Sequence, residues 1–193
     1  LMQGLLVPMC TYSIVAIGLN LCVGYLGELS IGHAGFMCVG AFSSAFATKL
    51  LQNVIPNQII LFITVLIIGT AAAAFFGFLI GIPVLRLKGD YLAIVTLAFG
   101  EIIKNLVNAI YLGRDSAGFH FSLKDSLSLG LAPDGEVLIK GAQGITGTPQ
   151  AATFTIGVVL VLITLFIVLN IINSRTGRAI MAIRDNRIAA ESV

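Results

Sequence analysis

A run of apolar residues, 91–112, is interrupted by polar side chains whose spacing could let them act together. With 100° of rotation per residue in a helix, these side chains share a narrow sector of one face. The candidates for lining a translocation path are Glu101, Lys104, Asn105 and Asn108. Ionisable groups inside a membrane normally face a protein interior or a water-filled cavity, and they mark ion or substrate pathways.

Two interpretations of this polar face remain open. Asp90 belongs to the same sector, and Glu101 is about 16 Å from it along the helix axis, near the middle of a membrane. In the first interpretation, the face lines a wet path for cargo. In the second, Glu101 and Lys104 neutralise each other and lock this helix against a neighbouring one.

Motifs for catalysis or nucleotide binding are absent from the sequence. It contains no G-x-x-x-x-G-K-[ST] phosphate loop, no H-E-x-x-H and no G-x-S-x-G. His33 and His120 have no companion at metal-ligand spacing, and we expect His33 to be a hydrogen-bonded packing residue. Cys10, Cys22 and Cys38 lack C-x-x-C spacing and are expected to fill space between helices. The chain is therefore predicted to be no enzyme, and to bind neither metal nor cofactor itself.

Composition predicts the elements that must hold these side chains. Of the 193 residues, 58% are hydrophobic and only 10% are charged, and the mean hydropathy is +1.02. Soluble domains carry about 25% charged residues, so this chain has too little polar surface for a soluble globule. We predict an all-α integral membrane protein, a polytopic helical bundle in contact with lipid. The net charge of +2 is too small to indicate a nucleic-acid partner.

About 20 apolar residues in a helix cross the hydrocarbon core, and residues 1–173 offer five such segments. They are Leu5–Leu26, Ile31–Leu51, Ile59–Leu85, Tyr91–Leu112 and Phe154–Ile172. The second is rich in glycine and serine, so it is predicted either to cross as one helix or to be a broken or partly re-entrant helix. Pro83 is expected to kink or end the third.

Basic residues in the connections predict the orientation. Arg86 and Lys88 lie between the third and fourth segments, and four arginines follow the fifth. Because short loops rich in Lys and Arg stay in the cytoplasm, residues 174–193 are predicted to be cytoplasmic. The loop 113–150, where basic residues are mixed with aspartates and Glu136, is then external.

Small residues at four-residue spacing predict where helices approach one another. In membranes such faces let two backbones come close. The predicted packing residues are Gly40 and Ser44 in the second segment, and Ala73, Gly77 and Gly81 in the third.

The last twenty residues, 174–193, are poor in long apolar runs and rich in arginine and alanine. On a helical wheel Arg184, Arg187 and Glu191 fall on one side, and Arg178 and Asp185 fall nearly opposite that group. Charges are therefore expected on both sides of the segment rather than opposite one lipid-facing side. Asp185 and Asn186 could end one short helix and start another. We interpret the segment as one that docks into a groove of a partner protein. The alternative is an ordinary basic segment that only fixes the orientation of the protein in the membrane.

Four stretches of the sequence resemble one known family. In chain order they read GLNLCVGYLGELSIGHAGF, RLKGDYLAIVTLAFGEI, GITGTP and SRTGRAIMAIRDNRIAAES. They are similar to the permease subunits of bacterial branched-chain amino acid ABC importers, from about Ala16 to the C-terminus. The chain departs from that pattern where a Gly-Gly pair is replaced by residues 140–143, KGAQ. It also stops at Val193, where family members continue, so we expect it to be truncated there.

The resemblance implies a role for the C-terminal segment, because AIRDNRIAAES corresponds to the cytoplasmic EAA-type loop that docks on the ATPase in this family. The residues that it assigns to ATPase coupling are Gly177, Arg178, Arg184, Asp185, Asn186, Ala189, Ala190 and Glu191. It also implies ATP-binding cassette subunits that use the ATP, a second permease chain and an external substrate-binding protein, assembled at the bacterial inner membrane.

The favoured hypothesis is a permease subunit for leucine, isoleucine or valine. The resemblance extends to permeases for urea, short amides or other amino acids. A hypothesis of another class is an ATP-independent channel or secondary carrier that uses the polar face around Glu101. A channel has no need of the coupling segment, which favours the importer.

Overall fold

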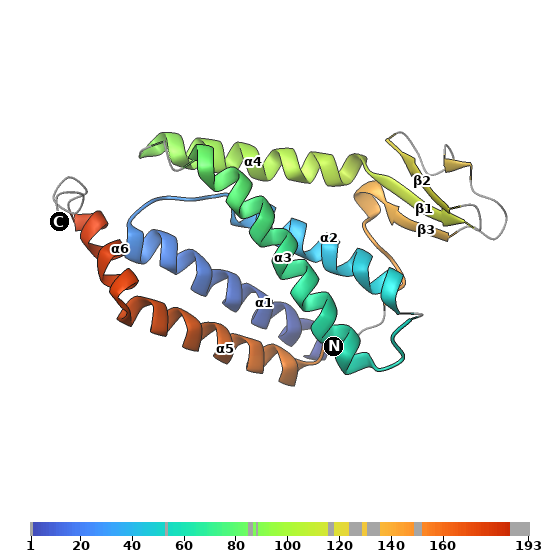
Figure 1. Cartoon of the computed structure of the whole chain (residues 1–193), viewed down its shortest axis with the longest axis horizontal. Coiled ribbons are helices and arrows are strands. Elements are labelled where there is room, and N and C mark those ends of the chain that lie inside the picture. Colours follow the sequence, from blue (N-terminus) through green and yellow to red (C-terminus); the bar gives the residue numbers. More distant parts are fainter. Residues whose placement is uncertain are drawn as a thin grey trace. The chain divides into compact units, whose positions relative to one another are not determined.

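The computed structural model describes residues 2–52, 54–84, 87, 89–115, 118–123, 129–130, 136–148 and 152–185. Most of them are helical (Figure 1). The helices are α1 (Met2–Asn20), the π-helix η1 (Leu21–Leu26), α2 (His33–Leu51), α3 (Gln58–Val84), α4 (Asp90–Ala109), the 3-10 turn η3 (Gly141–Gln143), α5 (Phe154–Asn173) and α6 (Arg175–Asp185). The strands are β1 (Tyr111–Asp115), β2 (Gly118–Ser122) and β3 (Glu136–Lys140).

Five helices within the described ranges are long and apolar enough to cross a membrane, as the hydropathy of the sequence predicts. They are Gly4–Leu26, His33–Leu51, Gln58–Val84, Tyr91–Ala109 and Phe154–Asn173. The prediction of a polytopic helical membrane protein is therefore confirmed. For the second segment, the prediction of a broken helix is wrong, because α2 is continuous, whereas partial re-entry stays a prediction. Pro83 lies inside α3, whose described residues run to Val84.

Large apolar side chains are exposed along these helices. Phe78 in α3 is 73% exposed and Phe166 in α5 is 68% exposed. Soluble monomers rarely expose contiguous apolar surface of this kind. The exposed apolar side chains of these helices must therefore be covered by lipid or by neighbouring protein.

The chain divides into two compact units by its internal contacts. The first comprises Leu1–His33, Leu87–Thr96 and Gln150–Val193, and the second comprises Ala34–Arg86 and Leu97–Pro149. In the first unit, α1 and α5 lie side by side and run in the same direction (Figure 1). A Cβ added at Gly157 would lie 3.0 Å from the Cβ of buried Cys10, which fits the space-filling role predicted for this cysteine.

In the second unit, α2 and α3 run in opposite directions (Figure 1), and small residues bring them together. A Cβ added at Gly69 would lie 3.0 Å from the carbonyl oxygen of Gly40 and 3.0 Å from the Cβ of Ser44. One added at Gly40 would lie 3.7 Å from the Cβ of Ala73. A small apolar core adjoins this contact and is formed by Ala47, Leu51, Ile55, Leu61 and Val65.

The other two predicted packing residues of α3 differ from each other. A Cβ added at Gly77 would lie 3.7 Å from the ring of Phe36 on α2. At Gly81 it would meet no described atom within 4 Å. The four-residue spacing of small residues thus extends backwards to Gly69, which the sequence analysis did not include, and the tightest contacts lie at that end.

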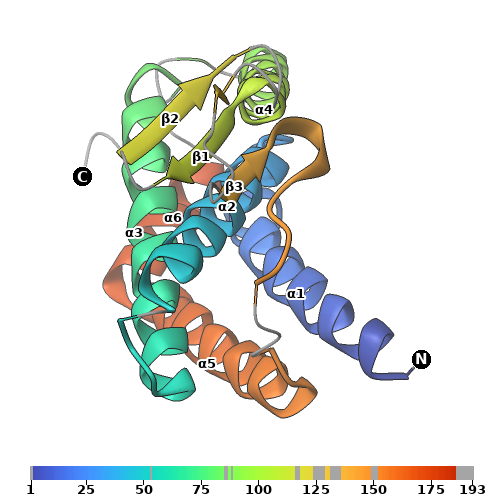
Figure 2. The same cartoon turned by 90° about the vertical axis from the view of Figure 1, so that its right-hand side faces the viewer.

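The segment predicted as an external loop contains a small sheet that the sequence analysis did not predict. Figure 2 shows β1 between β2 and β3, and both pairings are antiparallel. Because Tyr111 already pairs with Ser122 and Lys140, the helical part of the fourth segment ends at Ala109 rather than at the predicted Leu112. The sheet is a minor addition to a helical protein.

Candidate functional site

The polar face of α4 is present as predicted by its spacing. Lys104 Nζ lies 3.3 Å from Glu101 Oε2, one turn earlier in the same helix. The two side chains are 62% and 56% exposed, and Asn105 and Asn108 are exposed as well. Asp90 is the first residue of α4, but its side chain lies outside the described part of the chain.

This face is not covered by the described residues of the chain itself. Ile103, on another side of α4, is buried, whereas the ion pair and the two asparagines are open. Hydrocarbon does not solvate ionised or hydrogen-bonding groups, so the face must meet water or other protein. The ion pair between Glu101 and Lys104 is present, as both interpretations of the sequence require. It is exposed and is not buried against α2 or α3.

The corner between α5 and α6 is built from the residues SRTG. Ser174 caps α6, because its Oγ accepts a hydrogen bond from the Gly177 backbone N–H at 3.3 Å. The same hydroxyl donates to the carbonyl oxygen of Ile171 at 2.6 Å. A Cβ at Gly177 would collide with the carbonyl oxygens of Ile171 and Ile172. A predicted coupling residue, Gly177, is thus required for the sharp turn that projects α6 from the end of α5.

Arg184 is held within the chain. Its Nη1 donates to the carbonyl oxygen of Gly24 in η1 at 3.2 Å, and Nη2 lies 3.4 Å from Asp185 Oδ1. Gly27 ends η1 with φ +75°, and a Cβ there would lie 2.7 Å from Arg184 Cγ. A cation at the carboxyl end of a helix is stabilised by the exposed carbonyls. Arg184 therefore ties α6 to the end of the first membrane helix.

The rest of the predicted coupling set divides between exposed and undescribed residues. Arg178 is exposed and its Nη1 reaches the carbonyl oxygen of Asn173 at 3.5 Å. Ile180 and Met181 are half-buried, so α6 has an apolar side that the helical-wheel prediction of charge all round did not anticipate. Asn186, Ala189, Ala190 and Glu191 lie outside the described residues.

A buried lysine at the end of α2 escaped the sequence analysis. Lys49 is 7% exposed and lies in the last turn of the helix, where a cation is favoured. Gly147, with φ +78°, passes so close that a Cβ would lie 3.1 Å from Lys49 Nζ. The GITGTP stretch thus packs over this ammonium group. The available signal was a lysine in the last turn of a segment otherwise made of small and apolar residues.

In residues 140–143, KGAQ, which replace the Gly-Gly pair of the family pattern, one glycine makes the close contacts. Gly141 has φ +54°, and a Cβ there would lie 2.6 Å from the carbonyl oxygen of Asn108 and 2.7 Å from the ring of Tyr111. Its N–H donates to the carbonyl oxygen of Ile110 at 3.1 Å. Gly141 therefore joins the end of β3 to the end of α4, next to the polar face.

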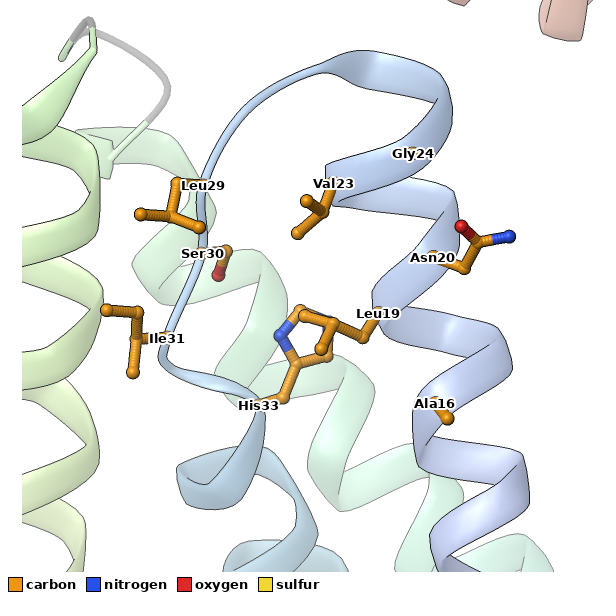
Figure 3. A pocket seen from close by; sticks show the side chains of 9 residues that line it. All are labelled: Ala16, Leu19, Asn20, Val23, Gly24, Leu29, Ser30, Ile31 and His33. Carbon is orange, nitrogen blue, oxygen red and sulfur yellow. The ribbon is translucent and has the colours of Figure 1, made fainter.

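A cavity of about 570 Å³ opens beside α1 and η1 in the first unit (Figure 3). It is lined by Ala16, Leu19, Asn20, Val23, Gly24, Leu29, Ser30, Ile31 and His33. His33 Nδ1 is buried and has no hydrogen-bond partner among the described residues. The predicted hydrogen bond is therefore not formed at Nδ1 by the described residues, because the side chains around it in this cavity are mainly aliphatic.

Comparison with known proteins gives the family. The profile of the family described as "Branched-chain amino acid transport system / permease component" matches residues 1–193. The chain belongs to this family. A member of it is a transport permease component and not an enzyme. The membrane helices and the family together make the chain part of a multi-pass membrane permease.

Curated relatives carry matching names. The chain is 35% identical over 191 residues to the high-affinity branched-chain amino acid transport system permease protein LivM of Escherichia coli K12, covering 94% of this chain and 43% of the relative. The LivM protein of Salmonella typhimurium LT2 is 34% identical with the same coverage. A probable LivM of Methanocaldococcus jannaschii is 30% identical over 118 residues, 48% of this chain and 34% of that protein. The chain thus spans less than half the length of these relatives. No solved structure matches it.

Proposed function

We propose that the chain is part of the transmembrane permease subunit of an ATP-driven importer that moves leucine, isoleucine or valine across the bacterial inner membrane. The observation that carries the proposal is the exposed polar face of α4 in a chain of this permease family. An external binding protein delivers the cargo, a second permease chain completes the path, and separate ATPase subunits bind and hydrolyse the ATP.

In this proposal Glu101, Lys104, Asn105 and Asn108 line the path. The asparagines offer donors and acceptors to a zwitterionic amino acid, and the ion pair stays hydrated on the same helix face. The competing role is contact with the second permease chain, in which the pair is buried between helices. A channel or secondary carrier would use the same face without ATP.

The residues after α5 form the coupling segment in this proposal. α6 projects from the Gly177 corner, carries Arg178 on its exposed side and leads directly into Asn186–Glu191. Exposed charges on a short helix with small alanines beyond it suit a groove in an ATPase subunit. Arg184 acts from the other side, by fixing α6 to η1.

The test uses the full-length permease assembled with its partner chains in vesicles. Ala190→Trp is expected to give an inserted permease that no longer co-purifies with the ATPase and no longer takes up leucine, because the indole blocks close approach. Thr176→Trp, an exposed position of α6 nearer the membrane, is the control for added bulk. Retention of ATP-driven uptake by Ala190→Trp at the parent rate would contradict the coupling role. Leucine uptake without ATP would favour the channel or carrier, and competition by urea or short amides would reassign the cargo.

Orientation is tested separately by thiol labelling in intact cells. Leu123→Cys, 62% exposed after β2, is expected to react with an impermeant maleimide added outside, because the sheet lies in the loop predicted to be external. Asp185→Cys, with a side chain 73% exposed at the end of described α6, should react only after the membrane is opened. The native cysteines are replaced by alanine in both variants. The opposite labelling pattern would reverse the topology.

A further inference from the structure

The cavity beside η1 has the composition of a small-molecule site. Ligand pockets in proteins are about 300–1,000 Å³, mostly apolar, with a few polar groups that orient the ligand, and this one measures about 570 Å³. The apolar part of its lining is aliphatic and includes Leu19, Val23 and Ile31. Its polar lining residues are Asn20, Ser30 and His33, and none of the described residues that line it is charged. A neutral ligand with an aliphatic end and a polar end matches this lining.

Two independent features mark the cavity as functional. The first is the backbone of its wall, because Val23 and Gly24 belong to the π-helix η1, and π-helical turns in otherwise α-helical segments frequently occur at functional sites. The second is His33. Figure 3 shows its imidazole beside Leu19, between α1 and the 29–31 segment, and its Nδ1 is buried without a partner. Buried polar atoms are almost always hydrogen-bonded in folded proteins, so this atom lacks a group that the described residues do not supply.

The opposite wall is held in place from outside the cavity. The Ile31 backbone N–H donates to Thr96 Oγ1 at 3.1 Å, and a Cβ at Gly32 would lie 2.9 Å from the carbonyl oxygen of Thr96. The segment 29–31 therefore cannot collapse onto α1 without breaking its contact with α4. The cavity stays open because its walls belong to separately anchored elements.

We propose that this cavity is a binding site for the aliphatic amino acid that the permease carries, with the cargo side chain against Leu19, Val23 and Ile31 and its polar end beside Ser30 and His33. The inference rests on the proposed function for the class of cargo. An uncharged lining fits a zwitterion, because its ammonium and carboxylate are close enough to offset each other and can hydrogen-bond to Ser30 and His33. It disfavours acidic or basic amino acids, because their additional side-chain charge has no counter-charge among the described lining residues. The polar end of the cargo supplies the hydrogen-bond partner that His33 Nδ1 lacks.

The first test is protection of a cysteine in the cavity. The full-length permease, assembled with its partners and with Cys10, Cys22 and Cys38 replaced by alanine, carries Ser30→Cys and is treated with N-ethylmaleimide. Leucine at ten times its dissociation constant is expected to slow the modification about tenfold, because only about one site in eleven is then empty. Aspartate at the same concentration should give no protection. Leu123→Cys, which is 62% exposed after β2 and does not line the cavity, is the control, whose rate should not depend on leucine.

The outcomes separate this site from the proposed function. If the complex takes up leucine with ATP but leucine does not protect Ser30→Cys, the cavity is not a cargo site and the importer proposal stands. If removing lipid accelerates modification and leucine has no effect, a lipid chain fills the cavity and the inference is overturned. If the complex takes up no leucine at all, the proposed function fails, whatever the labelling shows.

A second test changes the size of the cavity. Ala16→Phe adds a ring to its lining and is expected to weaken leucine binding by at least about tenfold, which is about 1.4 kcal/mol, while alanine, which has a shorter side chain, is affected less. Thr11→Phe places the same ring on an exposed part of α1 that does not line the cavity and should leave binding unchanged. Equal leucine affinity in the two variants would overturn the site.

Discussion

Replacing Gly69 by valine is expected to weaken the contact between α2 and α3 and to lower the yield of folded permease. Even the Cβ of the new side chain would stand 3.0 Å from the Gly40 carbonyl oxygen and from Ser44 Cβ, and valine adds two methyl groups to it. Both contact atoms are fixed close to the backbone of α2, one as a carbonyl oxygen and the other as a Cβ, so they cannot move aside without shifting that helix. Overpacking of this kind costs about 1–3 kcal/mol or more. In a membrane no hydrophobic force between helices offsets that loss, because lipid solvates the separated helices equally well.

The measurement is the monodisperse fraction of the full-length protein in detergent, together with its melting temperature. Gly81→Val is the matched control, because it makes the same change in the same helix where no described atom lies within 4 Å. We expect Gly81→Val to retain most of the parent yield and Gly69→Val to lose it. A similar loss in both variants would show that valine harms α3 itself rather than its contact with α2.

Glu101→Gln is expected to lower leucine uptake by about tenfold, equivalent to about 1.4 kcal/mol in the barrier, and to leave assembly intact. If α4 lines a wet path, water solvates Lys104 after its partner is neutralised, so the complex still forms. The charge balance of the path changes, however, because an unpaired ammonium then faces the cargo. Uptake rate and complex yield are measured side by side in vesicles, and Leu106→Met, an exposed residue on another side of α4, is the control.

The packing interpretation predicts the opposite result. If Glu101 and Lys104 are buried against a partner chain, a lone ammonium is stranded there, which costs about 3–5 kcal/mol, and the complex is lost. The double variant Glu101→Gln, Lys104→Gln would then restore assembly by removing both charges. Loss of assembly in the single variant with recovery in the double variant would overturn the path proposal.

The membrane helices could be predicted from the sequence because their length is set by the bilayer. The fifth segment was expected to run from Phe154 to Ile172, and α5 runs from Phe154 to Asn173. The end of the fourth segment was misplaced because hydropathy does not register that Tyr111 pairs with Lys140, which lies far along the chain. Strands of five residues are decided by such partners, and their local patterns are too short to be recognised alone.

The polar face of α4 could be predicted from the sequence because all of its residues lie on one helix. The α4 face needed only a helical period, and its ion pair followed from the spacing of Glu101 and Lys104. The cavity needed α1, η1 and the 29–31 segment to meet, which no local pattern encodes. The close passage of Gly147 over Lys49 is likewise a meeting of distant segments. The small residues at four-residue spacing in α3, in contrast, begin at Gly69 in the sequence itself. That contact could therefore have been predicted by starting the pattern one turn before Ala73.

If both proposals hold, the hydrogen bond from Arg184 to the Gly24 carbonyl links two binding equilibria. One end of the link is α6, where we place ATPase docking, and the other is the turn of η1 that lines the cavity. Thermodynamic linkage requires that the two act on each other by an equal factor. If a docked ATPase changes the affinity of the cavity for cargo through this arginine, cargo must change the affinity of the permease for its ATPase by the same ratio. Binding of cargo in the cavity would then change ATPase binding through the guanidinium group of Arg184 alone.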